Sequence, residues 1–149
     1  MILGIKSALF ELGGPHFMKI LRVTTSPGDV ADRISILKIK LKFIEDKKKL
    51  PAIKKELDFL EKDFLKFVEK TCLEKESLAK LKKFQESLLR LNTKGWKEIE
   101  RHWQCISDHD MHGLGVATLS MIKLNSRRVK MKNKVTDLFS YPFTEIKTY

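Results

Sequence analysis

The sequence is poor in the residues that interrupt or cross-link a chain. Among its 149 residues are seven glycines, four prolines and two cysteines, Cys72 and Cys105. Two isolated cysteines provide no disulfide framework and are typical of a reducing compartment, which predicts a cytoplasmic protein. Sparse glycine and proline, combined with long alternations of charged and apolar residues, favour helix over turn-rich folds.

Long hydrophobic runs and familiar catalytic patterns are missing too. No run approaches the roughly 20 apolar residues that a membrane-spanning helix needs, and residues 1–17 lack the small-residue cleavage site of a signal peptide. The sequence contains neither GxxxxGK(S/T) nor GxGxxG, and neither GxSxG nor HExxH. These absences argue against a nucleotide-binding loop and the common hydrolases, and no cofactor is expected.

Acidic residues are outnumbered, with 19 Asp and Glu against 30 Lys and Arg, which gives a net charge of +11. Most of the excess lies in residues 30–71, which carry +4, and residues 111–149, which carry +5. Such a balance suits an anionic partner such as nucleic acid, but it also serves solubility. One basic helical face is predicted, at spacings of 4, 3 and 4: Lys123, Arg127, Lys130 and Lys134. Because no aromatic residues interleave with this face, a solvated surface is favoured over nucleic-acid binding.

Apolar residues recur at helical spacing in four segments. The first pattern is Val30, Ile34, Leu37, Leu41 and Ile44, at spacings of 4, 3, 4 and 3, which predicts one buried helix face. Further helices are predicted at about 51–71, from about 76 to 106, and at about 116–139. The sequence therefore predicts a mostly α fold, an antiparallel bundle of about four helices.

The segments between and beside these helices carry further expectations. NTKG at 92–95 is a candidate break or kink in the third helix, and 107–115 is expected to be a loop by composition. A short strand near 18–24 is expected to pair with the C-terminal tail at 143–148. Residues 18–149 are expected to form a single domain.

The first helix begins with an unusually complete start signal. Ser26, Pro27 and Asp29 occupy the N-cap, first and third positions of the expected helix, which matches a capping box with a well-placed proline. The same free N–H groups are able to bind an anion. Because the Asp29 carboxylate already takes that place, capping is favoured over phosphate binding.

The stretch SPGDVADRISILKIK at 26–40 resembles the entrance SPGEL-IDKITILEIK of a family of small uncharacterised bacterial proteins. Asn125 and Arg128 match the family's N-D-x-R stretch, with Ser126 in the place of the aspartate, and Trp96 with Glu100 is similar to its LW-x-x-E. The closing EEKSY of the family is matched by four residues: Glu145, Lys147, Thr148 and Tyr149.

The resemblance covers about 18–149, and the family's chains begin near Met18, so residues 1–17 are expected to be an N-terminal extension. It implies a bacterial protein with a link to a polysaccharide or envelope pathway. It implies no particular activity.

A charged residue in the last helix marks the main candidate site. Arg128 interrupts an apolar stripe, where an arginine is costly unless it is paired with Asp32, Glu100 or Glu145. One interpretation is a buried ion pair that holds the helices together. The other is a polar pocket for a small anionic or sugar-like ligand. Its candidate lining residues are Asp32, Arg33, Lys40, Asn125, Arg128, Glu145, Lys147 and Tyr149.

Metal-ligand residue types also recur at helical spacing, in the order His102, Cys105, His109 and His112. Four ligands strung over about 15 Å of one straight helix are too far apart to surround one ion. These residues are therefore weak candidates, and no metal site is predicted.

Three functions remain open at this stage. The favoured one is a non-catalytic binding or accessory module that acts through a protein partner, as a homo-oligomer or through a small anionic ligand. The second is a small enzyme acting on an anionic or sugar-like substrate, since DVADRISIL distantly resembles helical chorismate mutases, which implies roles for Arg33, Lys40 and Arg128. The third is nucleic-acid binding through the basic last helix.

Overall fold

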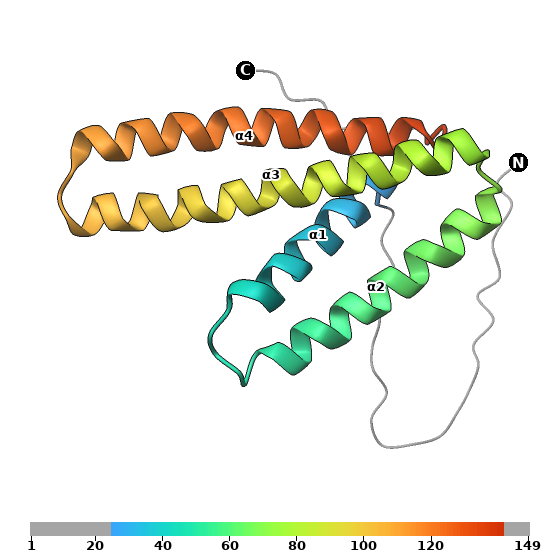
Figure 1. Cartoon of the computed structure of the whole chain (residues 1–149), viewed down its shortest axis with the longest axis horizontal. Helices are drawn as coiled ribbons and strands as arrows, with labels where there is room; N and C mark the ends of the chain where they lie inside the picture. Colours follow the sequence, from blue (N-terminus) through green and yellow to red (C-terminus); the bar gives the residue numbers. More distant parts are fainter. Residues whose placement is uncertain (1–24, 142–149) are drawn as a thin grey trace, which may run out of the picture.

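Four helices make up the computed structural model, which describes residues 25–141 (Figure 1). The helices are α1 (Pro27–Phe43), α2 (Leu50–Thr71), α3 (Lys75–Ser107) and α4 (Met111–Asp137). The prediction of a mostly α four-helix bundle is confirmed. The expected extension at 1–17, strand at 18–24 and tail at 143–148 lie outside the described residues.

The start of α1 is capped as its sequence predicts. The Ser26 hydroxyl accepts a hydrogen bond from the Asp29 backbone N–H at 3.0 Å and donates one to the Asp29 carboxylate at 2.6 Å. Pro27 occupies the first turn, where its missing N–H leaves no bond unmade. These contacts fix where α1 begins and therefore which of its side chains face inward.

Helix α1 lies between α2 and the hairpin of α3 and α4, and it contacts all three (Figure 1). Its Ile34 and Leu37 are buried in the main core with Leu57 and Leu88, while Ile39 is buried on a second side. The two apolar stripes of α1 are explained by this central place, because a helix covered on several sides needs more than one buried face.

Helix α2 diverges from α3 away from the turn that joins them (Figure 1). Aromatic side chains pack at its C-terminal end. Phe139 follows α4 in the sequence. The centroid of its ring lies 6.3 Å from that of Phe64 and 4.9 Å from that of Phe67. Edge-to-face and tilted aromatic pairs at these distances are favourable beyond simple area burial. The end of α2 is thereby packed against the residues that follow α4.

The expected break at 92–95 is wrong, because α3 continues through it. Asn92 is buried and donates hydrogen bonds to α1, so this poor helix former contributes a tertiary contact at its position. An added Cβ at Gly95 would meet nothing within 4 Å, and the helix continues through this position. Tertiary packing outweighs the weak helix propensity of both residues.

The expected loop at 107–115 is also wrong over most of its length, because α4 begins at Met111. Asp110 caps the new helix by accepting the Gly113 N–H at 2.8 Å. His109 takes a left-handed φ of 56° and reverses the chain between α3 and α4. A Cβ on Gly113 would lie 2.8 Å from the carboxyl carbon of Asp110 and 2.9 Å from the Cys105 sulfur, so glycine is needed here both beside the cap and for the close contact with α3.

The hairpin of α3 and α4 extends beyond the end of α1 (Figure 1). We call residues 96–122, at the far end of this hairpin, the distal arm. Within residues 25–141, no helix is long and apolar enough to cross a membrane.

Candidate functional site

A buried polar cluster joins α1, α3 and α4 around Asp32. The amide nitrogen of Asn92 donates to the Asp32 carboxylate at 2.8 Å and to the Ser35 hydroxyl at 2.6 Å, so both of its hydrogens are used. Ser35 in turn donates to the Asp32 backbone oxygen at 2.7 Å. Arg128 Nε lies 3.5 Å from the Asp32 carboxylate without a hydrogen bond to it. Asp32 is only 6% exposed, so its charge depends on these partners.

A second set of polar contacts lies one turn nearer the start of α1. Lys132 Nζ, almost fully buried, is 2.6 Å from the Asp29 carboxylate. The Gly28 N–H donates to the Thr136 hydroxyl at 3.2 Å, which gives one of the free donors at the helix start a partner. Two ion pairs and a hydrogen bond therefore join the first turns of α1 to α4.

The pKa of Asp29 lies below its ordinary value of 3.8. Partial burial by itself raises the pKa of this carboxyl, but the hydrogen bonds and positive charge of Lys132, with the hydrogen bonds of Ser26, outweigh burial. Because the charged form is favoured in the folded protein, the Asp29–Lys132 pair stabilises the fold above the unfolded-state pKa.

The contribution of the Asp29 carboxylate to folding stability should depend on pH. The stability from Asp29 should be lost as pH falls below about 4 and through its lowered folded-state pKa. Because the carboxylate is 45% exposed, we expect about 1 kcal/mol or less. Urea unfolding of the wild type and Asp29→Asn should show a difference near pH 6 that disappears near pH 2.5. A difference that persists or grows at low pH would contradict this assignment.

The structure brings together some of the predicted site residues and separates others. Asp32 and Arg128 are neighbours, and Asn125 lies one turn before Arg128 on the same helix. Arg33 points to α2 instead, where it forms a bidentate contact with Glu56 at 2.7 and 2.9 Å. Lys40 lies in the last turn of α1, two turns beyond Asp32. The other three predicted residues, Glu145, Lys147 and Tyr149, lie outside the described residues.

The sequence prediction missed four members of these contacts: Ser35, Asn92, Lys132 and Thr136. Asn92 and Thr136 follow the helical spacing of buried residues, since Asn92 comes four positions after Leu88 and Thr136 seven positions after Val129. That periodicity was a usable signal, but their polar character concealed it. The Asp32 carboxylate of α1 contacts Asn92 of α3 and Arg128 of α4, which is the arrangement expected of a tie between helices.

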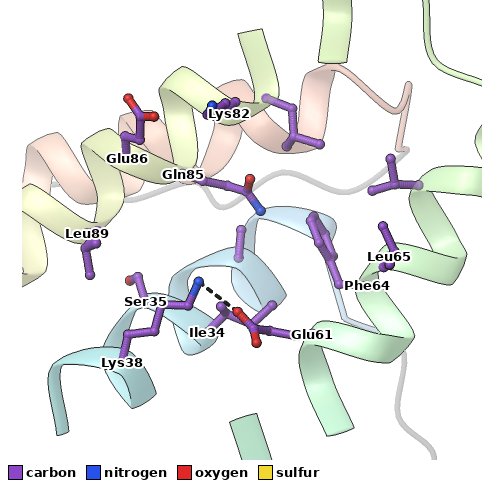
Figure 2. A pocket seen from close by; sticks show the side chains of 13 residues that line it. Ile34, Ser35, Lys38, Glu61, Phe64, Leu65, Lys82, Gln85, Glu86 and Leu89 are labelled. Atoms are coloured by element: carbon purple, nitrogen blue, oxygen red, sulfur yellow. Dashed lines mark ion pairs between the residues drawn. The ribbon is translucent and has the colours of Figure 1, made fainter. Parts of the chain in front are cut away.

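A separate cavity of about 460 Å³ lies where α2 diverges from α3 (Figure 2). Ile34, Phe64 and Leu81 give it an apolar floor. Lys38 and Glu61 face each other across it at 2.7 Å, and the Gln85 amide points toward its centre (Figure 2). A volume of this size suits a small ligand, but a reactive site also needs several convergent polar groups. Lys38 and Glu61 are paired with each other, and the other charged lining residues are Lys82 and Glu86, so the lining carries no net charge that would select a charged ligand.

The four candidate metal ligands do not form one cluster in the described structure. His102 and Cys105 lie on α3, His109 lies in the turn, and His112 lies in the first turn of α4. Within the part of the chain that the structure describes, no three His, Cys, Asp or Glu side chains come close enough to hold an ion.

Comparison of the chain with protein-family models, curated proteins and solved structures finds no match. The resemblance to small bacterial proteins therefore stays a prediction, and the functional argument depends on the chemistry of the surface.

Proposed function

We propose that this protein is a non-catalytic helical binding module that acts through a protein partner, and that the partner is a second copy of the chain. The observation that carries the proposal is the exposed apolar surface of the distal arm. Trp103 is 66% exposed and Met111 is 75% exposed, which is unusual for such large apolar side chains on a regular helix.

The apolar stripe of α3 continues past the point where α1 covers it. Leu81 and Leu88, seven residues apart, are buried in the core around α1. The same helical face continues along the arm to Ile99, Trp103 and Ile106, at spacings of 4 and 3, and these three side chains are exposed. A helix from a partner would cover this stripe in the way that α1 covers its beginning.

The interior of the arm is too small to hold its large side chains. The buried residues there are Cys105, Gly113 and Ala117, so the two helices lie close together around small groups. Large apolar residues of α4 remain outside, including Leu119 at 59% exposure and Ile122 at 53%. This is the reverse of the usual arrangement in a two-helix hairpin and supports an intermolecular core.

Charge makes the distal arm the part of the chain where a second copy meets little repulsion. The distal arm carries two basic and four acidic residues, a net −2, although the whole chain carries +11. Most pairings of two copies would bring like charges together and cost free energy. Contact between two distal arms, each with a net charge of only −2, costs less repulsion than contact between the basic parts of the chain. It also buries the apolar stripe, and a symmetric contact closes as a dimer.

Mass measurement over a concentration series tests the proposal. Light scattering coupled to size exclusion should give a dimer for the wild-type chain. Trp103→Glu should weaken association at least about tenfold, because it puts a charge at the centre of the apolar interface. Phe59→Glu is the matched control, since Phe59 is an exposed aromatic of α2, outside the arm. A wild-type chain that stays monomeric, or an equal effect of both variants, would refute self-association through the arm.

The proposal includes a cytoplasmic location and a link to a polysaccharide or envelope pathway. Free Cys72 and Cys105 support a reducing, cytoplasmic compartment. The sequence resemblance supports a role beside a polysaccharide or envelope pathway. The alternative of a small enzyme has less support, because Arg33 is paired with Glu56 and the charge of Arg128 is partly taken up by Asp32.

A further inference from the structure

A groove of about 390 Å³ runs between α3 and α4, outside the distal arm. Its basic lining residues are Arg90, Lys94, Arg127, Lys130 and Lys134. The other lining side chains are a serine, a leucine and a methionine, so none is acidic. The sequence predicted the face on α4, but only the fold places Arg90 and Lys94 of α3 opposite it.

These five charges are available to a ligand. In the range 25–141, no carboxylate forms an ion pair with any of them. Arg90 donates to the hydroxyl of Ser87 at 3.0 Å, and Lys134 Nζ lies 5.8 Å from the centre of the Phe84 ring. Both contacts orient a cation without neutralising it. Five unneutralised cations around one groove repel each other, so an anion that enters relieves that repulsion.

The groove is on a different face of the hairpin from the buried cluster. Asn92 faces α1, and Arg90 and Lys94 each lie two residues from it, which is about 200° round the helix. The groove also lies outside the distal arm: its last lining residue on α3 is Lys94, whereas the exposed apolar stripe begins at Ile99. A ligand here would leave the distal arm accessible.

We propose that this groove binds the phosphodiester backbone of a duplex nucleic acid without reading its bases. From Lys134 to Lys123 the basic face of α4 extends over eleven residues, or about 16 Å. That length accommodates several successive phosphates at the ~3.4 Å axial rise of each strand. Two parallel rows of lysine and arginine suit an elongated polyanion better than a single small anion.

The lining distinguishes between kinds of nucleic acid. Binding of single strands depends strongly on bases that stack on aromatic side chains. The groove lining contains no aromatic residue, so backbone contacts to a duplex are favoured. This inference goes beyond the proposed function and does not depend on self-association.

Salt-dependent binding to a duplex tests the proposal. Fluorescence anisotropy with a labelled random-sequence DNA duplex should show affinity that falls with salt between about 50 and 200 mM. Five phosphate contacts at about −0.9 each predict a slope of about −4.5 in log affinity against log salt. In Lys94→Gln with Lys130→Gln, the slope should become shallower by about 2, and the affinity should fall at least about tenfold.

The control variant removes two lysine charges from α2, outside the groove. Lys55→Gln with Lys66→Gln changes two exposed lysines of α2 and should leave the slope and affinity nearly unchanged. An equal loss in both double variants would overturn the groove as the site. Tighter binding to a single strand than to the duplex would overturn the assignment, as would binding to phosphatidylserine vesicles without binding to the duplex.

Discussion

Replacing Gly28 by alanine should lower the free energy of unfolding by about 3 kcal/mol. A Cβ at this position would collide with the backbone oxygen of Lys132 and lie 2.6 Å from the Thr136 hydroxyl. The Lys132 carbonyl is part of the regular backbone of α4 and has no room to retreat, so α1 and α4 must separate. That movement also weakens the hydrogen bond from the Gly28 N–H to Thr136.

Gly95→Ala is the matched control for this prediction. Nothing lies within 4 Å of a Cβ at position 95, which is in the interior of α3. Alanine there should stabilise the protein by up to about 1 kcal/mol through its better helix propensity. Urea unfolding followed by circular dichroism measures both variants. If the two substitutions shift stability in the same direction, the close approach of α1 to α4 is not the cause.

Asp32→Ala should be similarly damaging, at about 3 kcal/mol. The substitution removes the acceptor of Asn92 and the counter-charge of Arg128 at one stroke. The remaining polar groups are mostly buried, so they lose their partner without gaining full access to water. Asp63→Ala, which changes an exposed aspartate of α2, should cost less than about 0.5 kcal/mol.

A double-mutant cycle separates a tie from a ligand pocket. If Asp32 stabilises the fold through Arg128, then Arg128→Ala should destabilise the Asp32→Ala protein less than it destabilises the wild type. The two losses of unfolding free energy should differ by about 1 kcal/mol or more. Chemical unfolding of the four proteins gives this coupling energy directly. Additive losses, or variants that keep full stability, would show that Asp32 and Arg128 do not act as a structural pair.

The sequence was informative where one local pattern decides the structure. The start of α1 depends on Ser26 and Asp29, which are three residues apart, and their capping contacts were predicted. Apolar spacing likewise located the helices to within a few residues. Local rules failed at NTKG because the role of Asn92 depends on its bonds to α1. They failed at 107–115 because Gly113 packs against Cys105 of α3 as well as against its own cap, Asp110.

The candidate site was partly predictable for the same reason. An arginine on an apolar stripe requires a partner, and this requirement correctly identified Asp32 as one of three possibilities for Arg128. The sequence could not choose among them or reveal Lys132, because the choice depends on how two helices cross. The facing of Arg90 and Lys94 toward the basic face of α4 is likewise set by the register of the hairpin.

The central place of α1 has a consequence for how the chain reaches its fold. The hydrogen bond between Gly28 and Thr136 spans 108 residues, whereas α3 and α4 are joined by a short turn and are able to pair as soon as both exist. During synthesis, α1 emerges first but completes its buried contacts last. Until α4 leaves the ribosome, Asp29 and Asp32 lack their basic partners. Folding of the whole bundle should therefore be late and concerted, after a rapid local hairpin step.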